Sequence, residues 1–251
     1  MTIRCGYADT SIGQIHYREC GTGEPLLLLH PAPRSSRIYK RLMPLIEHSR
    51  VLALDLPGFG ESCDLVGGAT MQSIAAIIVE FLDALHVKRA DVFGLHSGNK
   101  VGAALAANAP EKVRHFIFAG MRHSILLDAA RRNEAMKTYV ANKKPVLREA
   151  DPEAFDDEQL DKLQCQRAYD ALYAANYAFD LTDALMRIAA PTLVLELAVP
   201  AEDALGSPGQ EICARMRNAQ LVKLLGNDRE FLQGKPNELA SLITKFLSSQ
   251  T

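Results

Sequence analysis

The sequence lacks the features that mark fibrous, disordered, disulfide-built and membrane-spanning proteins. Its 251 residues contain no Cys-x-x-Cys pair, no internal repeat, no low-complexity tract and no apolar run of membrane-spanning length. Charge of one sign is not in excess, because 28 Lys and Arg residues are balanced by 30 Asp and Glu residues, for a formal net charge of −2. We therefore expect neither nucleic acid nor a membrane surface as a partner.

The 5 cysteines are odd in number and widely spaced along the chain. This pattern predicts reduced thiols in a cytoplasmic protein, and it favours neither a disulfide framework nor a zinc site. The first residues show no basic stretch followed by an apolar segment, which a secretory signal requires. We expect a cytoplasmic protein that uses no metal.

Short apolar runs that alternate with helical patterns predict a mostly parallel sheet with helices on both faces. Segments 2–7 and 12–19 predict a hairpin with its turn at 8–10. The runs predicted as buried strands are 25–30, 51–55, 90–94, 113–119, 192–196 and 221–225. The fold class is therefore α/β, and the chain is long enough to bury a large core.

Residues 122–188 interrupt this alternation, because their pattern is helical throughout and rich in Ala, Arg, Asp and Glu. We predict a helical cap at 122–188, inserted into a core formed by 1–121 and 189–251. Such a cap lies over the carboxyl edge of the sheet, where open α/β folds keep their sites. The alternative is a set of ordinary surface helices, because caps and surface decorations share one composition.

Residues 94–98 read Gly-Leu-His-Ser-Gly and join a predicted strand to a predicted helix. A sharp strand–turn–helix of this kind needs small residues two before and two after its vertex, where strand and helix nearly collide. With His96 at the vertex, Gly94 and Gly98 meet that need. With Ser97 at the vertex, the positions fall on Leu95 and Asn99, so Ser97 is the less favoured alternative.

Four further segments resemble motifs of the α/β-hydrolase fold superfamily, in its order and spacing and over nearly the whole chain. Segment 27–33 (LLLHPAP) is similar to the strand that ends in His-Gly, and 55–62 (DLPGFGES) matches the Asp-x-Pro-Gly-x-Gly-x-Ser turn. Segments 190–195 (APTLVL) and 235–239 (KPNEL) are similar to the strand after the lid and to the start of the last helix. The resemblance implies an eight-stranded, mostly parallel sheet with an inserted helical lid.

The same match of motifs assigns three positions of this chain to a catalytic triad, but the residues at these positions are not those of the triad. His96 stands at the nucleophile position, Pro200 at the usual acid position and Arg229 at the usual histidine position. Serine hydrolysis needs a hydroxyl, a base and a group that orients the base, and neither Pro200 nor Arg229 supplies its part at neutral pH. A small shift of a loop could still provide an acid, from Asp228 or from Glu202 or Asp203.

We therefore take His96 and Asp228 as the candidate catalytic residues. An imidazole passes protons in both directions near neutral pH, although a pocket-lining histidine without that role is an equal alternative. By resemblance, the backbone amides of Ala32 and Ser97 form an oxyanion hole, whose shape is in doubt because Pro31 replaces the usual glycine.

Basic side chains at predicted loop ends form the candidate site for an anionic group. Two or three convergent cations bind a carboxylate well. The candidates for substrate binding are His30, Arg34, Arg122, His123 and Arg229; Lys100 follows the turn at His96, whereas Arg37 and Lys40 are more typical of solvated surface charge.

Three functions fit these residues. The first is cofactor-independent acid/base chemistry (lyase, isomerase or carbon–carbon bond chemistry) on a small, anionic carbonyl compound, with His96 as the acid/base. The second is hydrolysis at a rearranged site that uses a carboxylate within about 3.2 Å of the His96 ring. The third is a hydrolase scaffold that binds a ligand without turnover. A homo-oligomer is compatible with all three.

Because the vertex carries an imidazole, we predict that serine-directed fluorophosphonates do not label the protein. Intact-mass spectrometry after incubation with such a reagent checks this, with a serine esterase as the positive control. A covalent adduct on Ser97 would contradict the assignment of His96 to the vertex.

Overall fold

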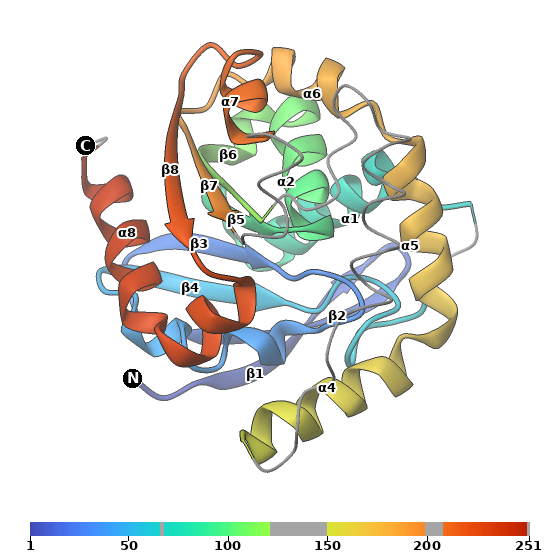
Figure 1. Ribbon diagram of the computed structural model, residues 1–251. Coiled ribbons are helices and arrows are strands. Elements are labelled where there is room, and N and C mark those ends of the chain that lie inside the picture. The colour runs from blue at the N-terminus through green and yellow to red at the C-terminus, as the bar shows by residue number, and fades with distance from the viewer. Residues whose placement is uncertain (66–67, 121–149, 199–207, 250–251) are drawn as a thin grey trace.

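The computed structural model describes residues 1–65, 68–120, 150–198 and 208–249, which form an eight-stranded sheet flanked by helices (Figure 1). The strand order is β1-β2-β4-β3-β5-β6-β7-β8. β1 and β4 pair antiparallel with β2, and the other neighbouring strands are parallel. The bounds are β1 Arg4–Thr10, β2 Gly13–Cys20, β3 Glu24–Leu29, β4 Ser49–Leu54, β5 Ala90–Leu95, β6 Val113–Ala119, β7 Thr192–Ala198 and β8 Ala219–Leu225. The predicted α/β class and mostly parallel sheet are confirmed.

The N-terminal hairpin turns later than its sequence predicted. Ala8 lies buried within β1, and the last pair of the hairpin is Thr10 opposite Gly13. Gly13 has a φ of +129°, which a residue without a Cβ adopts easily, and the amide of Ser11 donates to the carboxylate of Glu80 on the neighbouring helix. The prediction of a turn at 8–10 is therefore wrong, because residues 8–10 belong to the edge strand β1 and not to a loop.

Alternate residues of the central strands enter two apolar layers, one on each face of the sheet. In β3, Leu27 and Leu29 pack with helices α1 (Met71–Ala84) and α2 (Ser97–Asn108), whereas Leu26 and Leu28 pack with α8 (Pro236–Ser248). α1 starts at a capping box, in which the Thr70 and Ser73 side chains each bond the other residue's amide.

In the described part of the segment between β6 and β7, three helices follow one another: α4 (Pro152–Gln164), α5 (Gln166–Ala178) and α6 (Leu181–Arg187). Apolar side chains of α5 and α6 join the layer of α1 and α2, so α6 packs along α2 in the core layer. The cap at 122–188 stays a prediction, because 121–149 lies outside the described residues.

The remaining short elements of the described ranges are α7 (Pro208–Cys213), the 3-10 turns Ser36–Tyr39, Met43–Leu45 and Pro110–Lys112, and a π-helical turn at Glu230–Gly234. None of the helices in the described ranges is long and apolar enough to cross a membrane.

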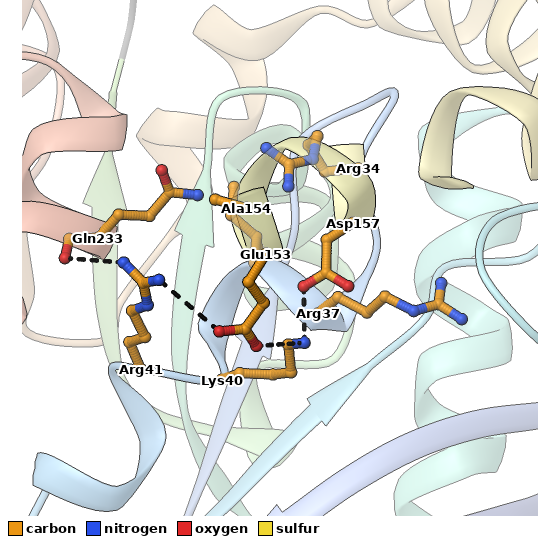
Figure 2. A pocket seen from close by; sticks show the side chains of 9 residues that line it. Arg34, Arg37, Lys40, Arg41, Glu153, Ala154, Asp157 and Gln233 are labelled. Atoms are coloured by element: carbon orange, nitrogen blue, oxygen red, sulfur yellow. Dashed lines mark hydrogen bonds and ion pairs between the residues drawn. The ribbon is translucent and has the colours of Figure 1, made fainter. Parts of the chain in front are cut away.

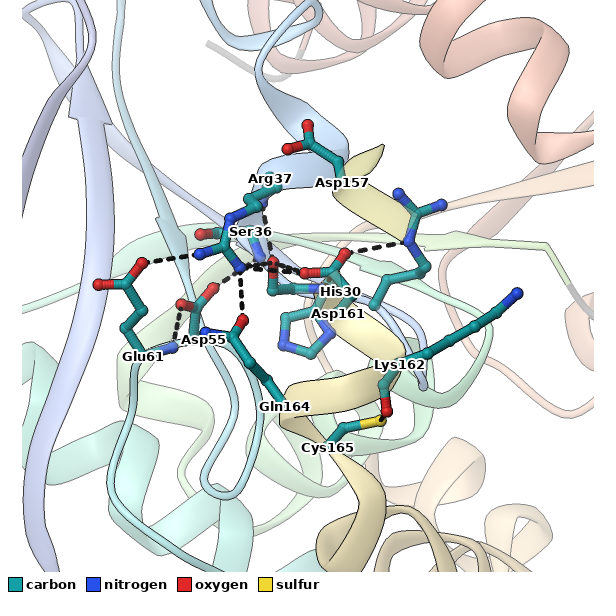
Figure 3. A network of polar contacts seen from close by, with 12 residues as sticks. His30, Ser36, Arg37, Asp55, Glu61, Asp157, Asp161, Lys162, Gln164 and Cys165 are labelled. Atoms are coloured by element: carbon teal, nitrogen blue, oxygen red, sulfur yellow. Dashed lines mark hydrogen bonds and ion pairs between the residues drawn. The ribbon is translucent and has the colours of Figure 1, made fainter. Parts of the chain in front are cut away.

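A buried carboxylate fixes the loop that follows β4. Asp55 is fully buried, lies 2.8 Å from Nδ1 of His16, and accepts hydrogen bonds from the amides of Ser36 and Glu61 at 2.7 and 3.0 Å (Figure 3). Burial alone would raise the pKa of Asp55, but these bonds hold that pKa well below its usual range. A Cβ on Gly60 would lie 2.1 Å from Oδ2 of Asp55, which explains the second glycine of the DLPGFGES turn.

A second buried carboxylate, Asp161 of α4, attaches the α4–α6 segment to the loop after β3. Asp161 accepts hydrogen bonds from Ser35 Oγ at 2.6 Å, from Arg34 Nε at 3.1 Å and from Arg37 Nη1 at 3.1 Å (Figure 3). Arg37 also reaches Glu61 at 2.7 Å, so it joins α4 to the loop that Asp55 holds. Arg37 is 8% exposed, which corrects the expectation that it is solvated surface charge.

More exposed ion pairs surround this cluster at a small pocket between α4 and the 3-10 turns (Figure 2). Lys40 lies 2.9 Å from Glu153 and 2.7 Å from Asp157, and Arg41 lies 2.8 Å from Asp151. Each such solvent-exposed ion pair contributes little to the free energy of folding. The buried contacts of Asp161 are therefore the part of this interface that the position of α4 depends on.

We predict that Asp161→Ala lowers the free energy of unfolding by about 3–5 kcal/mol, because it leaves the buried guanidinium of Arg37 and the partly buried one of Arg34 without their shared carboxylate. Urea titration followed by far-UV circular dichroism measures this change. Asp170→Ala, which removes an exposed carboxylate from α5, is the matched control and is expected to stay within about 0.5 kcal/mol of the parent. Equal effects of the two changes would contradict the role of Asp161.

Candidate active site

His96 stands at the vertex between β5 and α2, as the steric argument predicted. Its φ is +50° and its ψ is −112°, a strained conformation for a residue with a side chain. A Cβ on Gly98 would lie 2.2 Å from the carbonyl oxygen of Leu29, and a Cβ on Gly94 would lie 2.5 Å from Cα of Asn99. Larger residues are excluded at both positions, so the register with His96 at the vertex is confirmed.

The end of β6 leaves room for the His96 ring. A Cβ on Gly120 would lie 2.7 Å from Cε1 and 2.9 Å from Nδ1 of His96, so the imidazole packs directly against this glycine. Asn99 holds the same strand end, because its Nδ2 donates to the carbonyl oxygens of Ala119 at 2.9 Å and Gly120 at 3.1 Å. Gly120 and Asn99 are site residues that the sequence reasoning missed; a glycine directly after a predicted strand was the available signal.

Asp228 reaches His96 from the loop after β8. Its Oδ2 lies 3.3 Å from Nε2 of His96, and the side chains are 28% and 14% exposed. A carboxylate at this distance orients the ring and balances the positive charge that the ring acquires with a proton. The structure therefore brings together the two residues that the sequence analysis selected as catalytic candidates.

The loop that carries Asp228 is folded by its own hydrogen bonds. Asn227 accepts from the amide of Glu230 through its side chain (3.0 Å) and from the amide of Phe231 through its carbonyl (3.2 Å). Arg229, the next residue after Asp228, donates from Nε to Gln233 within the π-helical turn at 2.8 Å. Arg229 thus lies next to the candidate pair, but its guanidinium is held by its own turn.

The predicted oxyanion hole is occupied by a side chain of the protein. The amide of Ala32 donates to Oγ of Ser97 at 2.7 Å. The amide of Ser97 is the first of α2, where no acceptor within the helix exists. A substrate oxygen can therefore use the Ser97 amide directly, but it reaches the Ala32 amide only by displacing the Ser97 hydroxyl.

Two residues predicted to bind substrate serve the fold instead. His30 is fully buried; its Nε2 accepts from the amide of Leu56 at 2.9 Å, and its Nδ1 lies 3.1 Å from the carbonyl oxygen of Pro31. Burial lowers the pKa of His30, in keeping with a neutral ring. Arg34 is directed at α4, where Asp161 and Glu158 lie 3.1 and 3.7 Å from it. Sequence alone could not identify these partners, because Asp161 lies far along the chain.

Other sequence candidates fall outside the described residues: Arg122, His123, Pro200, Glu202 and Asp203. Within the described ranges, no group of three His, Cys, Asp or Glu side chains is placed to hold a metal ion.

Lys100, one turn beyond His96 on α2, is buried and 4% exposed. No carboxylate among the described residues lies within ion-pair distance of its amine. Burial lowers the pKa of Lys100 to about 8. A buried ammonium group without a counter-ion is costly, so this lysine weakens the fold unless something compensates it.

Comparisons with known proteins agree with this architecture. The sequence profile described as "Alpha/beta hydrolase family" matches residues 26–242. The chain is 36% identical to haloalkane dehalogenase 2 of Mycobacterium tuberculosis over 108 residues, which are 42% of this chain and 38% of that protein. The chain thus spans less than half the length of this relative, and only 29% of another, an acetyltransferase component from Cupriavidus necator.

The similarity to solved structures covers more of this chain than the sequence similarity to the relatives above. A hydrolase of Pseudomonas aeruginosa is similar at a TM-score of 0.78 and 25% identity, covering 97% of this chain and 98% of that one. The enol-lactonase of Burkholderia xenovorans is similar at a TM-score of 0.73 and 20% identity, covering 97% of this chain and 100% of that one. At such identity the second likeness concerns the fold alone.

Because Lys100 is buried, we predict that its effect on the free energy of unfolding depends on pH. Its pKa of about 8 in the folded protein lies below the ~10.4 of an unfolded lysine, so the cost of the buried charge is fully present below pH 8. It is lost as the pH rises towards 10.4. We expect Lys100→Met to be the more stable protein at pH 7, and its advantage over the parent to shrink by about 3 kcal/mol by pH 10.5.

Urea titrations of both proteins at pH 7, 9 and 10.5 measure this difference. Lys245→Met, the same change at an exposed position of α8, is the control and is expected to follow the parent at every pH. A constant difference between parent and Lys100→Met across this range would contradict the cost assigned to the buried charge.

Proposed function

The chain belongs to the α/β-hydrolase family, and within that family we propose that it catalyses serine-independent proton transfer on a small carbonyl compound. The His96–Asp228 pair is the acid/base, and no cofactor takes part. The observation that carries this proposal is the 3.3 Å contact between His96 Nε2 and Asp228 Oδ2 at the strained vertex. Strained backbone persists at functional sites where the surrounding structure enforces it.

The environment of Ser97 supports a mechanism without an acyl-enzyme. Its Oγ accepts the amide hydrogen of Ala32, which directs this hydroxyl at the loop after β3. An attacking serine needs a base within hydrogen-bond reach, and no contact between Ser97 and an imidazole is present in the described part of the chain. His96 therefore carries the chemistry that the family usually assigns to a hydroxyl at this position.

In the proposed reaction, the pair removes a proton from a carbon next to the substrate carbonyl. The electron pair of that C–H bond moves to the carbonyl oxygen and forms an enolate. The Ser97 amide donates a hydrogen bond to this oxygen, and Asp228 balances the charge of protonated His96. Return of the proton to a different carbon, or loss of a leaving group, completes an isomerisation or a lyase reaction.

Hydrolysis by an activated water is the second candidate, and the same contact favours it. The pair then takes a proton from water, whose oxygen adds to the carbonyl carbon. The names of the haloalkane dehalogenase and of the enol-lactonase describe hydrolytic reactions of those proteins. Both candidates need His96 and Asp228, but only the second incorporates solvent oxygen into the product.

We predict that the protein exchanges the α-hydrogens of a small carbonyl compound in D₂O, and that His96→Gln slows this exchange at least ~100-fold. Asp228→Asn is expected to slow it less, because the ring remains but loses its orienting charge. Proton NMR of a panel of keto acids, ketones and lactones measures the exchange and any net conversion. Reactions in H₂¹⁸O, analysed by mass spectrometry, separate the two candidates.

Two matched variants control for indirect effects. His86 is an exposed histidine whose φ is also positive, at +56°, so His86→Gln tests whether losing histidine at a strained position is itself harmful. Glu230 lies on the Asp228 loop and pairs with Lys235, so Glu230→Gln tests loss of charge from that loop. The proposal fails if His96→Gln retains full activity, or if no compound is exchanged or converted while ligands still bind.

A further inference from the structure

Three of the basic residues predicted near the site are neutralised by carboxylates of the protein itself. Arg34 and Arg37 bond Asp161, and Lys40 lies between Glu153 and Asp157. Lys100 differs from them, because it is more deeply buried than any of the three and has no acidic partner in the described ranges. An anion supplied from outside the chain would compensate its charge.

The helical register places Lys100 on the side of α2 away from the sheet. Gly98 and Gly102 face the sheet, since a Cβ on Gly98 would meet Leu29 and a Cβ on Gly102 would lie 2.7 Å from the ring of Phe116. At about 100° per residue, Lys100 lies on the opposite side of the helix from both glycines. The helices α1, α5 and α6 contact α2.

The face of α5 that enters the core carries a second buried polar group. Leu172 and Phe179 pack in the same apolar layer as α2, and Asn176 lies between them at helical spacing. Asn176 is 2% exposed, and its Oδ1 is buried with no hydrogen-bond donor in the described part of the chain. Buried amide oxygens without a donor are rare, but this oxygen is itself an acceptor and cannot bind an anion, so Lys100 alone is assigned to one.

We propose that Lys100 binds the carboxylate of the substrate, which is therefore a small carbonyl compound carrying a carboxylate. This inference rests on the proposed function for the role of the carbonyl, but the binding site does not depend on turnover. One helical turn separates Lys100 from His96, or ~6 Å along the α2 axis. A short keto acid has its carbonyl and carboxylate within that range.

Charge and burial agree with this assignment. The lysine keeps its proton at pH 7, because burial lowers its pKa only to about 8. A bound carboxylate gains a charge-assisted hydrogen bond in a site that excludes water. A neutral analogue of the same shape gains no such bond and leaves the ammonium uncompensated.

Thermal unfolding with carboxylates and their amides tests the proposal. The probes are pyruvate, acetoacetate and levulinate at 10 mM, each compared with its amide. At least one acid is expected to raise the Tm of the parent and of Lys245→Met by roughly 2–4 °C, whereas the amides leave it unchanged. Lys100→Met is expected to lose the response. Lys100→Gln serves the same purpose should the methionine variant not fold.

The outcomes separate this inference from the proposed function. If no acid of the panel shifts the parent, or if the shift persists in Lys100→Met and Lys100→Gln, the carboxylate site is wrong. The same titration in His96→Gln is expected to keep the shift, since binding needs no proton transfer. A shift that depends on Lys100, in a protein that exchanges no α-hydrogens, would leave the binding site standing and overturn only the proposed reaction.

Discussion

The close approach of α2 to the end of β3 is the constraint from which the rest of the site follows. A Cβ at Gly98 would lie 2.2 Å from a carbonyl oxygen of β3, so the chain must turn from β5 into α2 within one residue. That residue, His96, adopts a positive φ and projects its side chain at the carboxyl edge of the sheet. The strain is maintained because the buried strands on both sides cannot shift.

Within this frame the polar groups of the site have exchanged their usual places. The imidazole occupies the vertex, and the carboxylate comes from the loop after β8, where the family resemblance leads one to expect histidine. Asp228 and His96 still meet at 3.3 Å, so the fold holds an imidazole and a carboxylate together, in the reverse order along the chain to the one that the resemblance implies. The hydroxyl of Ser97, next to the vertex, accepts a hydrogen bond from the amide of Ala32 in the loop after β3.

The fold and the vertex could be predicted from sequence because both depend on local sterics and on short motifs. The glycines at 94 and 98 indicated that His96 stands at the vertex, and the alternation of apolar runs with helical patterns predicted the sheet. Partners of charged groups could not be predicted in this way. Arg34 and Asp161 are 127 residues apart, and nothing in either local sequence indicates that they meet. The role of Gly120 was missed for the same reason, since it is defined by the ring of His96.

The proposed reaction requires that His96 and Asp228 act as one unit in proton transfer, and a double-mutant cycle measures whether they do. The rate constants for α-hydrogen exchange are compared in the parent, His96→Gln, Asp228→Asn and the double variant. If the pair acts as a unit, removing Asp228 has no further effect once His96 is gone, so the double variant is as slow as His96→Gln alone. If Asp228→Asn lowers the rate by the same factor in both backgrounds, the two residues act independently and the proposed pair is contradicted.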